Sequence, residues 1–307
     1  MSAADKSGGA GSVTARFRPR TRVRKAARLL LTERFDSLWA RHGAALAGDA
    51  EAGIHQMRVE AKRLREAMRL FADVYRAADF QAGLAEDERL NDLLGAVRDA
   101  DVLVEFLGSL FKGDVPLLQD LRATIVAQRA VDQAALVAAL EQLVASDFAA
   151  RFRAMCRAGR HGVRHALSGT RLAEFAPLAV GERLRRVRKR LRAVQGEEDA
   201  AGLHRVRVAN KLLRYAMEAF VGIYDRRFEE AYKRVVELHK ALGDLHDLDV
   251  LAARIVDHAQ SPADAPELAP VLERIAARRA REYGRIQTFC DPDGMTVFAH
   301  QVMDALE

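Results

Sequence analysis

The spacing of apolar residues along the chain predicts helices over nearly its whole length. Apolar side chains recur at intervals of three, four and seven residues, as at Met57, Leu64, Met68 and Phe71, and this period is typical of one buried face of an α-helix. No segment shows the strict alternation of a half-buried strand. We expect helices at residues 20–47, 51–75, 79–110, 115–135, 137–168, 174–195, 199–222, 226–259, 264–287 and 294–306, separated by segments rich in turn-forming residues. The fold class predicted from this pattern is all-α.

The first 14 residues differ in composition from the rest of the chain. Residues 1–14 are small and polar, with the opening sequence "MSAADKSGGAGS", and are predicted to form a disordered tail. Residues 15–306 carry the helical pattern without an obvious linker. We therefore expect one domain, made of two helical halves at about residues 15–170 and 171–306.

Three segments of the first half return in the second half in the same order. The segment "IHQMRVEAKRLREAMRLF" (54–71) shares nine of eighteen residues with "LHRVRVANKLLRYAMEAF" (203–220). Further along, "LGAVRDADVL" (94–103) returns as "LGDLHDLDVL" (242–251), and "IVAQRA" (125–130) as "IAARRA" (275–280). The nearly constant offset predicts an internal duplication that forms two pseudo-symmetric helical bundles.

The first repeated segment carries a row of basic residues in both copies. His55, Arg58, Lys62 and Arg65 fall within a sector of about 80° on a helix, and the second copy repeats this spacing with His204, Arg207, Lys211 and Arg214. A solvated surface helix is the simpler interpretation of one such row. However, no carboxylate stands within either row to offset the repulsion between the cations. The pattern therefore favours a site for an anionic ligand.

The overall charge agrees with an anionic partner. The net charge is +6, and 41 Arg stand against 8 Lys, which suits bidentate contacts to phosphate oxygens. A genome composition that enriches Ala and Arg together explains the same bias equally well. The segment "GERLRRVRKRLRAV" adds Arg183, Arg186 and Arg190 as candidate ligand contacts. Aromatic residues that would stack on unpaired bases are not interleaved with these arginines.

The second repeated segment contributes paired aspartates. Asp99 and Asp101 recur as Asp247 and Asp249, and we expect them to support the site by orienting its cations. Binding of Mg²⁺ for phosphoryl transfer is the less favoured interpretation, because no phosphate-binding glycine-rich loop accompanies them. Neither His55 nor His204 stands in an HExxH or HxxxH pairing. We therefore expect no catalytic residue, no metal site and no cofactor.

Targeting and redox signals are weak in this sequence. No run of 18 apolar residues is present, and no apolar stretch follows the first charges at the N-terminus. We therefore expect a cytoplasmic protein without a membrane partner. Cys156 and Cys290 have no metal-ligand spacing and are expected to be free thiols.

Taken together, the repeated basic segments and the "LGAVRDADVL" and "LGDLHDLDVL" segments that follow them resemble the CHAD family, the conserved histidine α-helical domain. The resemblance covers residues 15–306. It implies a compact domain of two helical bundles around a basic central groove or pore, which binds inorganic polyphosphate without catalysis and directs proteins to polyphosphate granules. Other polyanions are left open as ligands, and the resemblance names no protein partner.

The expected ligand contacts follow the matching motifs, with Arg98 and His246 placed beside them by the second repeated segment. Two departures, Leu212 opposite Arg63 and Glu218 opposite Arg69, predict a weaker second row. The alternatives are a nucleic-acid-binding protein and, third, a polyphosphate phosphohydrolase. The full set of expected polyphosphate-binding residues is His55, Arg58, Lys62, Arg63, Arg65, Arg69, Arg98, Arg183, Arg186, Arg190, His204, Arg207, Lys211, Arg214 and His246.

Overall fold

The computed structural model describes residues 17–75, 77–111, 115–158, 169–259, 265–290 and 292–306. This part of the chain is all-α, and its β-type pairing is a single isolated bridge between Arg22 and Arg171. The predicted disordered tail lies outside the described residues. The helices are α1 (Val23–Trp39), α2 (His42–Leu46), α3 (Gln56–Leu70), α4 (Ala77–Leu110), α5 (Pro116–Ala145), α6 (Phe148–Ala158), α7 (Leu172–Arg192), α8 (Ala200–Glu218), α9 (Arg226–His258), α10 (Ala265–Cys290) and α11 (Pro292–Asp304), with a π-turn η2 (Ala50–His55) before α3 and a 3-10 turn η3 (Ala72–Val74) after it.

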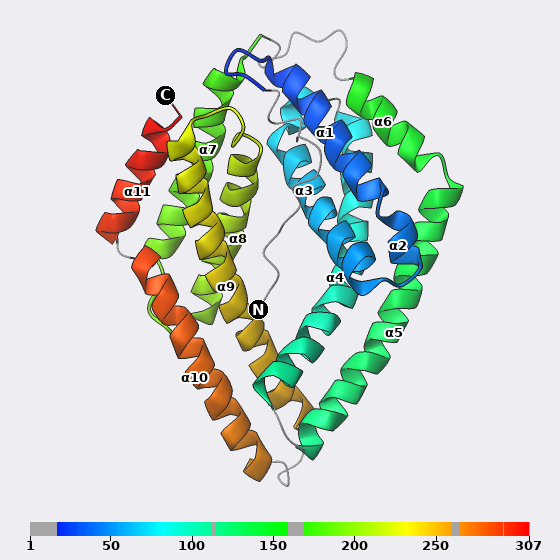
Figure 1. Ribbon diagram of the computed structural model, residues 1–307, viewed down its shortest axis with the longest axis vertical. Coiled ribbons are helices and arrows are strands. Elements are labelled where there is room, and N and C mark those ends of the chain that lie inside the picture. The colour runs from blue at the N-terminus through cyan, green and yellow to red at the C-terminus, as the bar shows by residue number, and fades with distance from the viewer. Residues whose placement is uncertain are drawn as a thin grey trace.

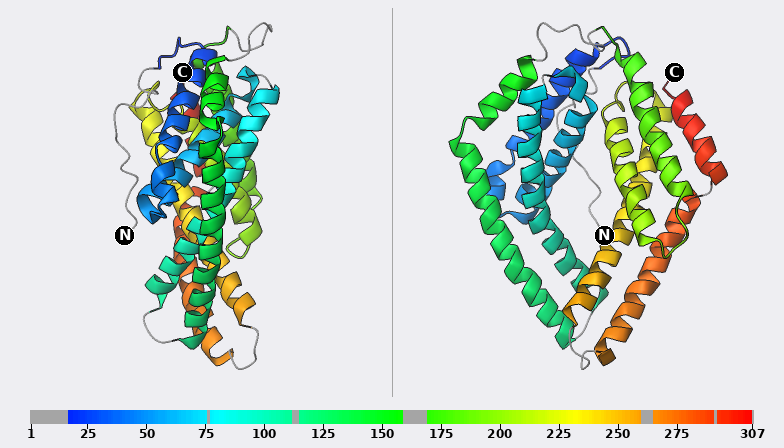
Figure 2. Two further views of the ribbon diagram at one scale, coloured as in Figure 1. Left: turned by 90° about the vertical axis from the view of Figure 1, so that its right-hand side faces the viewer. Right: turned by 180° about the vertical axis from the view of Figure 1, so that it is seen from behind.

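The helices form two groups that meet along the middle of the molecule. Figure 1 shows α1 to α6 on one side and α7 to α11 on the other, with α5 and α10 as long outer edges. The inner helices α3 and α8 pack directly against each other, and α4 contacts α9 towards the narrow end. Seen from the side, the molecule is much narrower (Figure 2). The two helices that carry the repeated basic segment are therefore central neighbours.

Two apolar clusters hold these groups together. The larger cluster contains Phe35, Met57 and Leu64 from the first group together with Val206 and Leu213 from the second. The smaller cluster lies where α4, α5, α9 and α10 converge, and it includes Leu103, Ile125 and Ile255. The larger apolar cluster therefore crosses from one helix group to the other.

The helix boundaries in the middle of the first group differ from the prediction. Residues 115–135 and 137–168 were expected as two helices, but α5 continues through Leu136 and Leu140, both fully buried, to Ala145. The chain turns at Ser146, whose hydroxyl accepts from the Phe148 backbone N–H at 3.2 Å. A Ser-Asp pair is a weak turn signal in sequence. Residues 159–168 lie outside the described part.

Helix α5 also has the length and composition of a membrane span, and 22% of the apolar window is buried within the structure. Polar contacts tie it to its neighbours. Arg129 donates to Asp101 of α4 at 2.5 Å, and Asp120 lies 2.9 Å from Nε2 of His258 on α9. These contacts make α5 one layer of the helical assembly.

The free thiol of Cys156 is buried, and burial raises its pKa to about 12. A thiol held in this protonated state is a poor nucleophile and metal ligand. The side chain of Cys290 lies outside the described part of the structure.

A buried ion-pair network crosses the boundary between the two groups. Arg63 of α3 donates to Glu60 at 2.7 Å and lies 2.8 Å from Glu218 of α8, with 9% and 13% of the Arg63 and Glu218 side chains exposed. Arg34 of α1 also pairs with Glu218, at 3.0 Å, and Tyr232 of α9 donates to it at 3.3 Å. The network therefore fixes α3 against α8.

We expect Glu218→Leu to destabilise the fold by about 3 kcal/mol, because it leaves buried arginines without one of their carboxylates. Urea unfolding followed by circular dichroism measures the change. Glu230→Gln is the control, since Glu230 and Arg226 form an exposed pair worth less than about 1 kcal/mol. Equal midpoints for the two variants would show that the network does not stabilise the fold.

Candidate functional site

The two basic rows face each other across the contact between α3 and α8. The charges of Arg207 and Lys211 on α8 act on Lys62 of α3, and the charges of Arg65 and Arg69 on α3 act on Lys211. We call this surface the cationic seam. It consists of His55, Arg58, Lys62 and Arg65 from η2 and α3, and His204, Arg207, Lys211 and Arg214 from α8.

The seam follows from the amphipathic pattern of the two helices. Met57 and Leu64 of α3 and Val206 and Leu213 of α8 are buried in the larger apolar cluster. Burying these residues turns the basic edge of each helix towards the other helix group. The spacing of apolar residues that predicted these helices therefore also determines where their basic side chains lie.

Burial, together with the crowding of like charges, lowers the pKa of both lysines of the seam. Burial, and then the Arg58 charge, lowers the pKa of Lys62 to about 7, although Asp99 acts in the opposite direction. Burial also lowers the pKa of Lys211, and the Arg65 charge lowers it further. The seam therefore holds more positive charge than its own carboxylates neutralise, and an anion placed there would stabilise the protonated amines.

Each histidine at the head of a row has a basic or imidazole neighbour from the following helix. Burial lowers the pKa of His55, and Arg98 of α4 lowers it further. His204 lies with its Nδ1 3.4 Å from Nδ1 of His246 on α9, and burial lowers the pKa of both rings. The structure therefore brings Arg98 and His246 to the seam.

His239 of α9 is a further residue at the seam, outside the predicted set. Burial lowers its pKa to about 3, and the charges of Arg214, Arg207, Lys62 and Lys211 act in the same direction. Its Nδ1 is buried without a hydrogen-bond partner in the described structure. His246 follows His239 at the seventh position, and this spacing places both on one face of α9; it was the available sequence signal.

The four predicted carboxylates divide into two kinds. Asp101 accepts from Arg129 of α5 at 2.5 Å, and Asp249 accepts from Arg279 of α10 at 2.6 Å. These two aspartates tie neighbouring long helices together. Asp99 instead accepts from Arg58 of the seam at 2.8 Å, and the charge of Asp247 interacts with Arg207 of the seam.

Other predicted cations have partners away from the opposing row. Arg63 belongs to the buried network with Glu60 and Glu218. Arg69 donates to Glu66 at 3.1 Å and to Glu88 at 2.6 Å. Glu66 also lies 3.3 Å from Nε of Arg65, with 4% of its side chain exposed. A buried carboxylate thus neutralises part of the charge at this end of the seam.

The basic residues of α7 lie on different faces of this helix. Arg183 donates to the backbone carbonyl of Ala179 at 2.9 Å and lies close enough to Glu66 for their charges to interact. Arg186 pairs with Glu182 at 2.6 Å, and Arg190 is exposed. A shallow hollow of about 260 Å³ is lined by other cations of this helix, namely Arg185, Arg188, Lys189 and Arg192. Of the predicted α7 residues, Arg183 interacts with a charge on α3.

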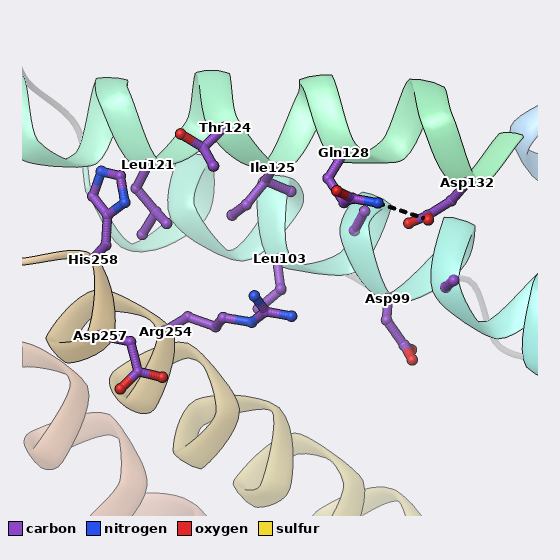
Figure 3. Close-up of a pocket in the computed structure, with 12 residues that line it drawn as sticks. Asp99, Leu103, Leu121, Thr124, Ile125, Gln128, Asp132, Arg254, Asp257 and His258 are labelled. Atoms are coloured by element: carbon purple, nitrogen blue, oxygen red, sulfur yellow. Dashed lines mark hydrogen bonds between the residues drawn. The ribbon is translucent and has the colours of Figure 1, made fainter.

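A larger cavity of about 430 Å³ lies beside the seam, between α4, α5 and α9. Its floor includes Leu103, Leu121 and Ile125, and Arg254 extends from α9 towards α4 (Figure 3). Asp99 stands at one end of the cavity, and its carboxylate points away from Gln128 and Asp132 of α5. The cavity therefore borders the seam at Asp99.

Among the residues that the structure describes, no three His, Cys, Asp or Glu side chains form a group that could hold a metal ion.

Comparison with known proteins relates the chain to a protein family. The CHAD domain model matches residues 29–256 and 233–306. The chain is 29% identical over 255 residues to "Uncharacterized protein Rv2226" of Mycobacterium tuberculosis, a match that covers 75% of this chain and 44% of that protein. The chain therefore spans less than half the length of this relative.

Two solved structures share the fold. The CHAD domain from the plant Ricinus communis is 25% identical, with a TM-score of 0.64, and the match covers 92% of this chain and 93% of that one. PptA from Streptomyces chartreusis is 17% identical, with a TM-score of 0.61, and the match covers 92% of this chain and 100% of that one. With a family model that matches most of its length, the chain belongs to the CHAD domain family.

Proposed function

We propose that this chain binds inorganic polyphosphate at the cationic seam and does so without catalysis. The proposal rests on one observation, that the two basic rows face each other. The charges of Arg207 and Lys211 on α8 are close enough to Lys62 on α3 to lower its pKa. The resemblance of the repeated motifs to the CHAD family supports polyphosphate as the anion. Binding would favour the protonated form of two amines whose pKa values are lowered by burial and by neighbouring like charges.

The spacing of the rows suits a linear polyanion. Residues three or four apart on a helix lie about 4.5–6 Å apart along its axis, so Arg58, Lys62 and Arg65 present donors at regular steps. A phosphate chain offers many equal charges and few other features. Several donors that act on one flexible chain would give affinity largely through release of its counterions.

We further propose that the two halves arose by duplication and form the two walls of one groove. The ion pairs Asp101–Arg129 and Asp249–Arg279 support this idea, because their members occupy matching positions of the repeated segments. Each pair ties the long inner helix of its half to the long outer helix. Related packing in the two halves would present the two basic rows in related orientations.

The cellular setting follows as part of the same proposal. A cytoplasmic protein with this seam would associate with polyphosphate granules, where phosphate chains are concentrated. Fluorescence microscopy of the tagged chain, in cells with and without the capacity to make polyphosphate, tests the localisation. A diffuse signal in both would contradict it.

We expect affinity to increase with phosphate chain length until both rows are occupied, and orthophosphate to bind poorly. Isothermal titration with orthophosphate, pyrophosphate, tripolyphosphate and long chains at constant ionic strength measures this dependence. Equal affinity for pyrophosphate and long chains would contradict an extended groove.

Two further measurements separate the alternatives. Duplex and single-stranded DNA, titrated as competitors at the same salt concentration, would displace polyphosphate at equal charge concentration if the chain were a nucleic-acid-binding protein. Release of phosphate from polyphosphate on addition of Mg²⁺ would instead identify a phosphohydrolase. We expect neither result.

A further inference from the structure

Asp99 is a carboxylate in direct contact with the cationic seam. It comes from α4, not from the two helices that carry the basic rows, and accepts from Nη1 of Arg58 at 2.8 Å. The Arg58 side chain is 16% exposed, whereas that of Asp99 is 67% exposed. The pair thus joins a fixed cation to a carboxylate that solvent reaches freely.

The second aspartate of the same motif is held differently. Asp101 and Arg129 are both partly buried, with 16% and 24% of their side chains exposed. Asp249 and Arg279 show the same enclosure, at 22% and 12%. Separating either of these pairs would leave a poorly solvated charge. Asp99 can leave Arg58 and become hydrated at far lower cost.

The structure also provides room for Asp99 to move. Asp99 lines one end of the 430 Å³ cavity between α4, α5 and α9 (Figure 3). A cavity of this volume with polar side chains along its edge accommodates several waters. A carboxylate released from Arg58 therefore has a solvated place beside the seam.

Asp247 approaches the same part of the seam from the other half of the chain. The charges of Arg207 and Arg58 act on it, and so does the charge of Asp99. Burial raises the pKa of Asp247 to about 6, with Asp99 adding to the shift. The first aspartates of the two motifs therefore converge on the two arginines that face each other across α3 and α8.

We infer that Asp99 is an internal counter-ion of the cationic seam, which a bound polyanion displaces from Arg58, and that the nearby charge of Asp247 opposes binding of an anion at Arg207. The inference rests on the proposed function and adds to it a determinant of affinity. The Asp99 carboxylate stands where a ligand phosphate would accept a hydrogen bond from Arg58. The two carboxylates lower the affinity for any anion that binds Arg58 or Arg207. In the unliganded protein they reduce the repulsion between the cations of the seam.

Displacement has a distinct signature in the salt dependence of binding. When a phosphate replaces Asp99 on Arg58, the freed carboxylate takes up a cation from solution, which offsets one of the counterions released by the ligand. An Asn at this position takes up none. Removing the carboxylate should therefore make the plot of log affinity against log salt steeper by up to about one unit.

The test is titration of tripolyphosphate and of long-chain polyphosphate into the wild-type chain and Asp99→Asn at several salt concentrations. We expect Asp99→Asn to bind about 3- to 10-fold more tightly at low salt, because Arg58 no longer has to leave a charge-assisted hydrogen bond, with the steeper salt dependence described above. Asp247→Asn should act in the same direction and provides an independent variant.

Two matched controls separate this effect from a change in net charge. Glu105→Gln removes one negative charge from an exposed position of the same helix and should leave both affinity and salt dependence close to wild type. Asp101→Asn should lower the unfolding temperature without tightening binding, because Asp101 pairs with Arg129 instead of the seam.

The outcomes distinguish the inference from the function on which it rests. Wild-type protein that fails to bind either phosphate chain contradicts the proposed function. Wild-type protein that binds, together with an Asp99→Asn variant that matches Glu105→Gln in affinity and salt dependence, overturns the inference alone.

Discussion

A chain in which Arg58 and Arg207 are both replaced by Glu should show no measurable binding of long-chain polyphosphate. Each reversal removes a charge-assisted donor and adds a carboxylate that repels the ligand. Hydrogen bonds to charged groups contribute about 1.5–3 kcal/mol, so each single variant should lose about 10- to 100-fold in affinity. Isothermal titration at low salt, with circular dichroism to confirm helix content, measures the loss.

The control for this pair is Arg205→Glu. Arg205 belongs to α8, as Arg207 does, but its side chain is 49% exposed and lies 3.9 Å from Asp199, outside the seam. We expect its affinity to stay within about twofold of wild type. The number of ligands bound per chain is equally informative. If each single variant bound half as many ligands as the wild type with unchanged affinity, each row would be a separate binding site.

Affinity for polyphosphate should fall as pH rises from about 7 to 9, by up to tenfold per pH unit. The sign follows from Lys62, whose pKa in the unliganded protein is about 7 because of burial and the Arg58 charge. Below that pH the amine already carries its proton. Above it the free amine is neutral, and a bound phosphate raises its pKa, so binding must take up a proton.

The histidines extend this dependence to lower pH. His55, His204 and His246 have pKa values lowered from about 6.5 by burial, so they are mostly neutral at pH 7 and gain protons beside a bound polyanion as the pH falls towards 6. Long chains are the suitable ligand for this measurement, since their weakly acidic groups are confined to the ends.

Titration at a series of pH values separates the two contributions. Lys62→Met should flatten the dependence above pH 7, and the double variant His55→Gln/His204→Gln should flatten it below pH 7. Lys233→Met, which removes an exposed lysine of α9, is the control and should retain the wild-type slope. The idea fails if the wild type shows no dependence, or if the Lys62 and histidine variants keep it unchanged.

Several features were predictable from sequence because they are local. The period of apolar residues identified helices at most of the observed positions, and the spacing of His55, Arg58, Lys62 and Arg65 placed these residues on one helical edge. Helical geometry depends on neighbours three and four residues away, so a single segment contains this information. The match of the motifs to the CHAD domain family was likewise readable from their order along the chain.

The tertiary structure decided which of these edges meet and which charges remain available. Arg63 and Arg65 are separated by one residue in the same basic segment, yet Arg63 is enclosed by Glu60 and Glu218 whereas Arg65 acts on Lys211 across the seam. Likewise, Asp99 pairs with Arg58, whereas Asp101 pairs with Arg129. Partners of this kind are far apart in sequence, and their meeting depends on the packing of the whole apolar core, which no single helical segment determines.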